Sequence, residues 1–217
     1  MKIPFAASIL TIAVAAPAQA QVEAGDVLVR ARAILVSPTE EAGPVTPTFP
    51  GGSVGVSDSV MPEIDFTYML TDHIGAELIL ATTKHDIVGR GTLAGIDKLA
   101  DTWALPPTLT LQYHFAPKGH VRPYVGAGIN YTTFYSADAS RSLETAIGKT
   151  EVNLEDSFGY ALQAGVDIDI APRVFLNFDV KYIDIDTTAR LRTGAAINRV
   201  DVSLDPVVPS IGIGMRF

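Results

Sequence analysis

Apolar and polar residues alternate along eight segments of this 217-residue chain. The clearest segment is 105–115, where Leu109, Leu111 and Tyr113 alternate with Thr110 and Gln112. A period of two puts successive side chains on opposite faces of a strand, so each segment is predicted to be a β-strand with one apolar face. The predicted strands cover residues 27–35, 63–70, 74–80, 105–115, 124–131, 158–170, 174–182 and 207–217.

The connections between these strands alternate in length. Segments 71–73, 116–122 and 171–173 are short and carry Pro, Gly or Asp, as tight turns do. Segments 37–61, 84–103, 136–156 and 186–205 are expected to be long loops. Tight turns on one side and long loops on the other are typical of outer-membrane barrels. The pattern predicts an all-β fold, an eight-stranded antiparallel up-and-down transmembrane β-barrel. A last strand that reaches Phe217 fits closure, which leaves no free edge.

Periodicity alone leaves open which face points inward, because a soluble lipocalin-like barrel also alternates. Four features favour the membrane barrel. The chain has no cysteine, its polar face carries charges of both signs, and its mean hydropathy is +0.26. Aromatic residues also cluster near the ends of the apolar faces, as interfacial girdles do. These are Phe66, Tyr68, Tyr113, Phe115, Phe158, Tyr160, Phe178, Tyr182 and Phe217.

The first 20 residues predict export. Lys2, an apolar stretch and Ala18-Gln19-Ala20 have the order of a signal peptide, with cleavage expected between Ala20 and Gln21. The expected domains are a leader at 1–20 and one barrel at 21–217, placed in the outer membrane of a bacterium. A net charge of −8 argues against a nucleic-acid partner. The oligomeric state stays open.

A layer of polar side chains is predicted inside the barrel. Its members are Arg30, Arg32, Glu63, Asp65, Glu77, Gln112, His114, Asp179, Lys181 and Arg216. One interpretation is a polar channel lining, and the other is an ionic plug that closes the lumen. Eight strands leave an interior that side chains just fill, which favours the plug.

The outer half of the lumen is predicted to be apolar, because Ile34, Ile79, Phe134 and Ile183 point inward there. A hydrophobic solute could enter this zone but not cross the charged layer below, where desolvation is costly. We therefore expect sideways exit into the lipid. Pro62 and Pro106-Pro107 are the candidate lateral openings, since proline donates no ladder hydrogen bond.

Signals for catalysis are weak. Gly51 to Gly55 matches a G-x-S-x-G hydrolase pattern but follows a proline-rich loop instead of preceding a helix. His85-Asp86 could be half of a dyad, although no nucleophile is placed beside it. The four histidines show no metal-ligand spacing. We predict no catalytic residue, no metal site and no cofactor.

Several motifs resemble those of the outer membrane protein W (OmpW) family. They are Gly25 to Arg32 with Val36-Ser37-Pro38, Pro62 to Leu78, Leu105 to Phe115, Arg122 to Tyr131, Ser157 to Asp167, and the closing Arg216-Phe217. The resemblance covers nearly the whole predicted mature chain and departs at Arg173-Val174-Phe175, where the family usually has a Trp.

The resemblance implies an eight-stranded barrel with a narrow channel for passive uptake of small hydrophobic solutes and lateral release. It also implies that the barrel-assembly machinery reads Phe217 and that the partners include outer-membrane lipid and lipopolysaccharide. Two other classes remain open. One is a structural or host-facing surface barrel whose loops bind, and the other is an outer-membrane enzyme.

Overall fold

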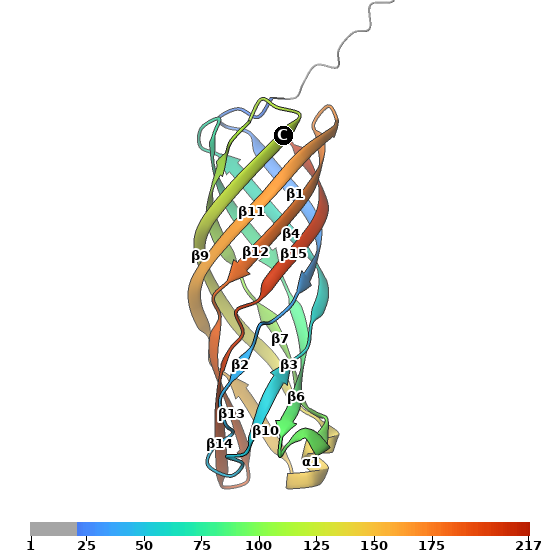
Figure 1. Cartoon of the computed structure of the whole chain (residues 1–217), viewed down its shortest axis with the longest axis vertical. Helices are drawn as coiled ribbons and strands as arrows, with labels where there is room; N and C mark the ends of the chain where they lie inside the picture. The colour runs from blue at the N-terminus through green and yellow to red at the C-terminus, as the bar shows by residue number, and fades with distance from the viewer. Residues whose placement is uncertain (1–20) are drawn as a thin grey trace, which may run out of the picture.

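The computed structural model, which describes residues 21–217, contains eight antiparallel strands that close into a barrel (Figure 1). They are β1 (Val27–Val36), β4 (Ser59–Met69), β5 (Ile74–Ala81), β8 (Thr108–His114), β9 (Val121–Ala139), β11 (Ser157–Ala171), β12 (Val174–Ile183) and β15 (Val207–Arg216). Each pairs with the next of the eight along the chain, and β15 pairs with β1 to close the ring. The predicted fold class is confirmed.

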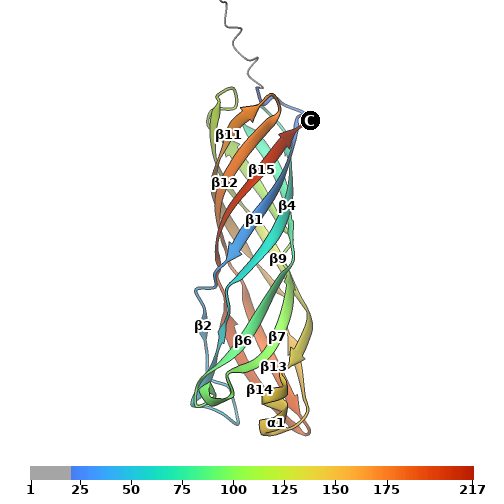
Figure 2. The same ribbon diagram turned by 90° about the vertical axis from the view of Figure 1, so that its right-hand side faces the viewer.

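The segments expected to be long loops are mostly strands, which corrects that expectation. They hold β2 (Glu41–Ala42), β3 (Gly52–Val56), β6 (Thr83–Gly91), β7 (Lys98–Leu105), β10 (Thr150–Leu154), β13 (Asp186–Thr193) and β14 (Ala196–Ser203). They also hold a 3-10 helix η1 (Ala94–Ile96) and a short helix α1 (Arg141–Ile147). These elements form an extension that continues the wall at the end opposite the C-terminus (Figure 2).

The extension has its own apolar interior, which explains why its strands form. Apolar residues of β6, β7, β10, β13 and β14 are buried against one another, and α1 adds Leu143 to the same cluster. Ser140 caps α1 because its Oγ accepts a hydrogen bond from the backbone N–H of Leu143 at 3.0 Å. In the eight-stranded barrel itself, toward the C-terminal end, the interior is mainly polar. The molecule therefore changes along its axis from a charged lumen to an apolar one.

Register places the alternating faces as the membrane interpretation requires. Arg30 and Arg32 are buried and lie directly opposite Asp65 and Glu63 of β4. Leu162 on the other face is 50% exposed. Gly212 faces Arg32 across β1 and β15, and a Cβ there would lie 2.2 Å from the carbonyl oxygen of Ala31. Glycine at 212 thus lets the two strands and the Arg32 side chain share this space.

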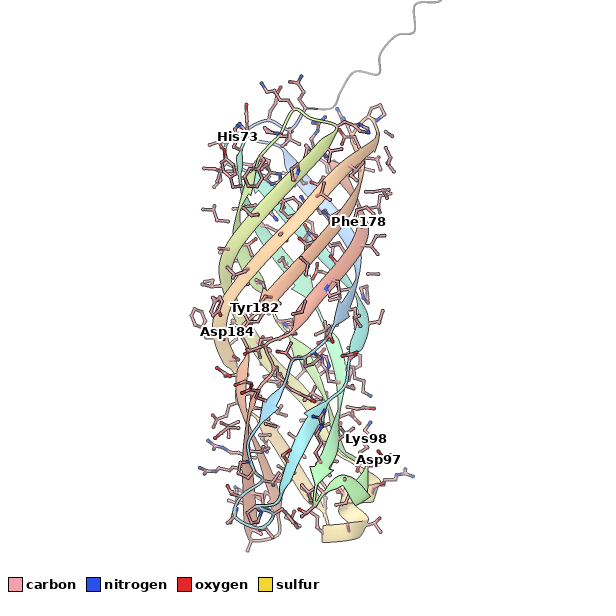
Figure 3. The ribbon with its side chains drawn as sticks, in the orientation of Figure 1. His73, Asp97, Lys98, Phe178, Tyr182 and Asp184 are labelled. Carbon is pink, nitrogen blue, oxygen red and sulfur yellow. The ribbon has the colours of Figure 1, made fainter. Side chains whose placement is uncertain are left out.

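Aromatic side chains gather near both ends of the lipid-facing wall. His73 stacks on Tyr113 at the end where the C-terminus lies, with ring centroids 5.6 Å apart (Figure 3). Tyr182 lies where the barrel passes into the extension. Trp103 and Tyr135, which were not among the predicted girdle residues, stack at 6.3 Å. Their position fits the aromatic girdles of membrane barrels.

No helix within residues 21–217 is both long enough and apolar enough to span a lipid bilayer.

Candidate functional site in the barrel lumen

An apolar cluster closes the lumen at the C-terminal end of the barrel. Val22, Leu28, Met69 and Phe175 pack together there with at most 1% exposure. The ring of Phe175 lies 5.6 Å from the guanidinium of Arg30. Arg30 belongs to the charged layer, which follows this cluster along the axis toward the extension. Sequence reasoning missed this cluster, although one signal was present: Phe175 is an aromatic residue on the polar face of its strand.

Two arginines hold the centre of the charged layer. Arg30 contacts Asp65 and Asp167, each at 3.0 Å, and Arg32 contacts Asp65 at 2.8 Å and Glu77 at 2.9 Å. All five side chains are fully buried. Paired charges of this kind tolerate burial far better than single ones, because each attraction offsets part of the lost hydration.

The edge of the charged layer nearest the extension is built around Lys181. Its ammonium contacts Glu63 at 2.8 Å and Asp179 at 3.0 Å. Tyr124 donates a hydrogen bond from its hydroxyl to Asp179 at 2.9 Å and accepts one from the amide of Asn177 at the same distance. These contacts connect side chains of β1, β4, β5, β9, β11 and β12 across the interior, which favours the plug interpretation.

Three predicted members of the layer lie outside its centre. Gln112 and His114 contact each other at 3.1 Å, and Gln112 donates to Gln163 at 3.2 Å on the side of β8. Arg216 lies near Asp26 at 3.7 Å, at the end of β15, and joins none of the central ion pairs. The sequence identifies the inward face at these positions but not their depth along the axis.

Two small cavities lie on the side of the charged layer that faces the extension. The four predicted residues Ile34, Ile79, Phe134 and Ile183 line one of them, of about 50 Å³, which we call the inner chamber. A second, of about 40 Å³, lies in the extension and is called the outer cavity. Its walls are apolar residues of β3, β6, β7, β10, β13 and β14, with two threonines and His85.

Four residues line both cavities and therefore form a septum between them: Val56, His85, Phe134 and Leu204. The ring of His85 is held by two hydrogen bonds. Nδ1 lies 2.8 Å from the carbonyl oxygen of Ser57, and Nε2 lies 3.1 Å from the hydroxyl of Thr83. Burial lowers the pKa of His85 below its ordinary value of 6.5, and this outweighs the opposite effects of the hydrogen bond to Ser57 and of the charges of Asp58 and Asp86.

His85 predicts a pH dependence of the extension. Below about 6.5 the unfolded chain binds a proton at His85 that the folded chain does not, so the free energy of unfolding falls until the lower folded pKa is reached. We expect the stability difference between wild type and His85→Gln to shift in this direction between pH 7 and 5, followed by Trp103 fluorescence during denaturant unfolding. A pH-independent difference would contradict a buried neutral His85.

The candidate catalytic residues Ser53, His85 and Asp86 lie in paired strands of the extension. Asp86 pairs with Lys98 at 2.7 Å and does not orient His85. Ser53 lies in β3 opposite Arg90, so it is not on a strand-to-helix turn. Within residues 21–217 no group of three or more His, Cys, Asp or Glu side chains is arranged to hold a metal ion.

The wall beside the inner chamber is interrupted between β1 and β15. The ladder pairs Ile34 with Ser210, and the next bridge pairs Ser37 with Val207, which leaves Leu35 and Val36 unpaired on this side. An open groove of about 340 Å³ lies on the outer surface here, lined in part by Val60 and Pro209. Ile34 lines both this groove and the inner chamber, so the two spaces meet the wall at the same residue.

The predicted prolines lie near the same level. Pro62 is opposite Ala33, which borders the groove, and Pro106 lines the inner chamber. The carbonyl of Pro107 accepts the backbone N–H of Tyr131 at 3.1 Å. At the other end, Phe217 pairs with Val27 through its backbone and is 63% exposed. The predicted leader, with its cleavage site at Ala20, lies outside the described residues, which begin at Gln21.

Comparison with known proteins gives consistent matches. The model of the OmpW family matches residues 23–217. Outer membrane protein W of Escherichia coli K12 is 41% identical over 197 residues, which is 90% of each chain. The dibenzothiophene metabolism operon protein PahQ of Pseudomonas aeruginosa is 36% identical over 172 residues, covering 77% of this chain and 76% of that one. The crystal structure of OprG from Pseudomonas aeruginosa superposes with a TM-score of 0.84 at 33% identity, over 91% of this chain and 98% of that one.

Proposed function

Because the chain belongs to the OmpW family of outer-membrane β-barrels, we propose that it is a passive conduit for small hydrophobic molecules. Solutes enter through the extension, pass the septum into the inner chamber and leave sideways into the lipid. Relatives are outer-membrane proteins of Gram-negative bacteria, and this barrel lies in the same membrane. A relative named for a dibenzothiophene metabolism operon supports an apolar substrate, since dibenzothiophene is an aromatic hydrocarbon-like molecule.

The observation that carries the proposal is the position of Ile34. Ile34 lines both the inner chamber and the outer groove at the point where the β1–β15 ladder is interrupted. Moving Ile34 and parting the unpaired residues would join the two spaces without breaking a continuous ladder. Passage from the inner chamber toward the C-terminal end of the barrel is opposed by the buried ion pairs of Arg32 and Lys181. An apolar solute would have to desolvate or displace them.

Pro62 and Pro106-Pro107 remain the second candidate opening. Pro106 lines the inner chamber, and no ladder hydrogen bond can come from the nitrogen of either residue in that pair. The β1–β15 seam has the added feature of a groove on its lipid side, so we place the exit there.

A reversible clamp across the seam tests this route. Ala33 and Ile211 are directly opposed partners on the lipid face, close enough for a disulfide after replacement by cysteine. The chain has no other cysteine, so the pair forms one defined bond. We expect the oxidised Ala33→Cys/Ile211→Cys variant to lose most uptake of a hydrophobic fluorophore into liposomes, and a reductant to restore it.

The matched control is Val29→Cys/Met215→Cys, a pair of the same type on the same two strands but farther from the groove. Oxidation there should leave uptake unchanged. If the clamp at 33 and 211 has no effect while uptake persists, the exit lies elsewhere, with Pro106-Pro107 next to be tested. Equal permeation of small hydrophilic solutes would instead support an axial channel.

The remaining assignments are part of the same proposal. We take residues 1–20 to be a cleaved leader and Phe217 to be a contact of the barrel-assembly machinery, with lipid and lipopolysaccharide around the wall. The protein is proposed to be no enzyme, because neither Ser53 nor His85 has catalytic partners. A host-facing surface barrel would predict no uptake above that of protein-free liposomes, which the same assay measures.

A further inference from the structure

The inner chamber has a polar rim whose hydrogen bonds determine what it can bind. Glu63, Thr83, His85, Thr108 and Thr132 line it, and none is more than 7% exposed. Buried polar atoms in proteins nearly always have partners, so a ligand meets only the donors and acceptors that the protein leaves unused. Each hydroxyl proton of the three threonines, and the ring proton of His85, has an acceptor within the protein.

Two threonine protons are used by the wall itself. Thr108 donates to the carbonyl oxygen of Pro106 at 3.0 Å, and Thr132 donates to the side-chain oxygen of Asn130 at 2.7 Å. The orientation of the Asn130 amide is fixed, because its nitrogen faces the same Pro106 carbonyl at 3.3 Å, and a carbonyl can only accept. Thr132 therefore offers a ligand lone pairs but no proton.

The third threonine proton is used by His85. Nδ1 of His85 must carry its proton, because its partner, the Ser57 carbonyl, can only accept. In the neutral ring Nε2 is then an acceptor, so the Thr83 hydroxyl donates to it across 3.1 Å. Neither residue has a proton left for the chamber.

Glu63 is the strongest acceptor of the rim. Its Oε1 receives Lys181 at 2.8 Å and faces Arg32 at 3.3 Å. Its Oε2 has no donor among residues 21–217, although the side chain is only 3% exposed. The central layer also has more carboxylates than cations: Glu63, Asp65, Glu77, Asp167 and Asp179 against Arg30, Arg32 and Lys181. A further donor at Oε2 would be favoured by this local excess of negative charge.

We propose that the inner chamber is a binding subsite for small apolar molecules that carry a hydrogen-bond-donating head, a hydroxyl or an amine, which Glu63 Oε2 accepts. Ethers, ketones and carboxylates of the same carbon skeleton bind poorly, because the rim presents acceptors only. The subsite gives the proposed conduit a substrate preference, and in that sense it rests on the proposed function.

Chamber size sets the choice of probe. A cavity of about 150 Å³ holds benzene, whereas the inner chamber is about 50 Å³. A four-carbon ligand has five heavy atoms against the six of benzene, so it serves as a small probe that still requires the septum residues to move, and larger solutes require more movement. 1-Butanol and its isomer methyl propyl ether have the same atoms and differ in the hydroxyl proton.

Binding is measured by methyl NMR of Ile34, Ile79 and Ile183 in lipid nanodiscs of the full barrel. We expect 1-butanol to bind about tenfold or more tightly than methyl propyl ether, as for loss of a hydrogen bond to a charged group, with n-butylamine behaving like the alcohol. In Glu63→Gln the amide nitrogen supplies a donor at the Oε2 position, because Lys181 retains the carbonyl oxygen. The alcohol preference should then fall to about twofold or less by the same reasoning.

Thr132→Val removes the second acceptor without changing side-chain shape and should reduce the preference in part. The control is Thr150→Val, another buried strand threonine that lines neither cavity and should leave the ratio unchanged. A wild-type ratio near one overturns the proposal, as does an unchanged ratio in Glu63→Gln. Should that variant not fold, an unchanged ratio in Thr132→Val decides against it.

Uptake of the hydrophobic fluorophore into liposomes is measured in parallel, which separates this proposal from the previous one. Selective binding of butanol without protein-dependent fluorophore uptake supports the subsite and overturns the conduit. Protein-dependent fluorophore uptake with equal binding of alcohol and ether overturns the subsite and leaves the conduit standing.

Discussion

Replacing Arg30 with leucine is expected to destabilise the barrel by about 3–5 kcal/mol, the usual result of removing one partner from a buried ion pair. Arg30 is fully buried and contacts Asp65 and Asp167, each at 3.0 Å. Without it both carboxylates stay in the lumen with their hydration lost and much of their compensation gone. Reversible denaturant unfolding of the folded barrel in lipid vesicles measures the change.

Two further variants make the test specific. Arg190→Leu removes an arginine whose side chain is 48% exposed and paired with Glu155 in the extension, and exposed pairs contribute about 0–1 kcal/mol. Adding Asp167→Asn to Arg30→Leu should recover part of the loss, because one unpaired charge is removed. A cost at Arg30 no larger than that at Arg190 would mean that the layer is not a coupled plug.

The sequence could predict the barrel because the membrane imposes a strict rule on its wall. Every second residue of a spanning strand faces lipid and must be apolar, as in Leu109, Leu111 and Tyr113 of β8. The extension follows no such rule, since its outer face carries exposed charged side chains such as Arg90 and Arg190. Its β6 strand, Thr83–Gly91, mixes charged, apolar and glycine residues and has an irregular register at Ile87 and Val88 against β7. Its sequence therefore has the pattern of a loop.

Only the charged part of the candidate site could be predicted from the sequence. Charged residues on a buried face must pair, and this rule identifies Arg30, Arg32 and Lys181 as lumen residues from the sequence alone. The septum could not be found this way, because Val56, His85 and Leu204 come from three segments that were expected to be loops. The gap in the β1–β15 ladder was also missed, although Pro209, which faces Leu35 there and donates no ladder hydrogen bond, was a signal for it.

Arginine at the lipid face provides the second large expected effect. Leu162 lies within β11, is 50% exposed and pairs with Ala127 and Tyr182 on its neighbours. It lies four residues farther along β11 than Phe158, away from the end where the barrel passes into the extension, which places it deeper in the hydrocarbon. Leu162→Arg should cost about 2–4 kcal/mol in reversible unfolding from lipid, because a guanidinium there must leave water.

Phe158 is the matched site, four residues earlier on the same face of the same strand and 70% exposed. It pairs with Tyr131 at the outer end of the wall, where an arginine can reach the headgroups, so Phe158→Arg should cost only about 0–1 kcal/mol from the charge. Leu162→Gln and Phe158→Gln measure the loss of apolar contact alone. After this correction, equal costs at 158 and 162 would contradict the assigned depth of β11, and with it the position of the inner chamber relative to the lipid.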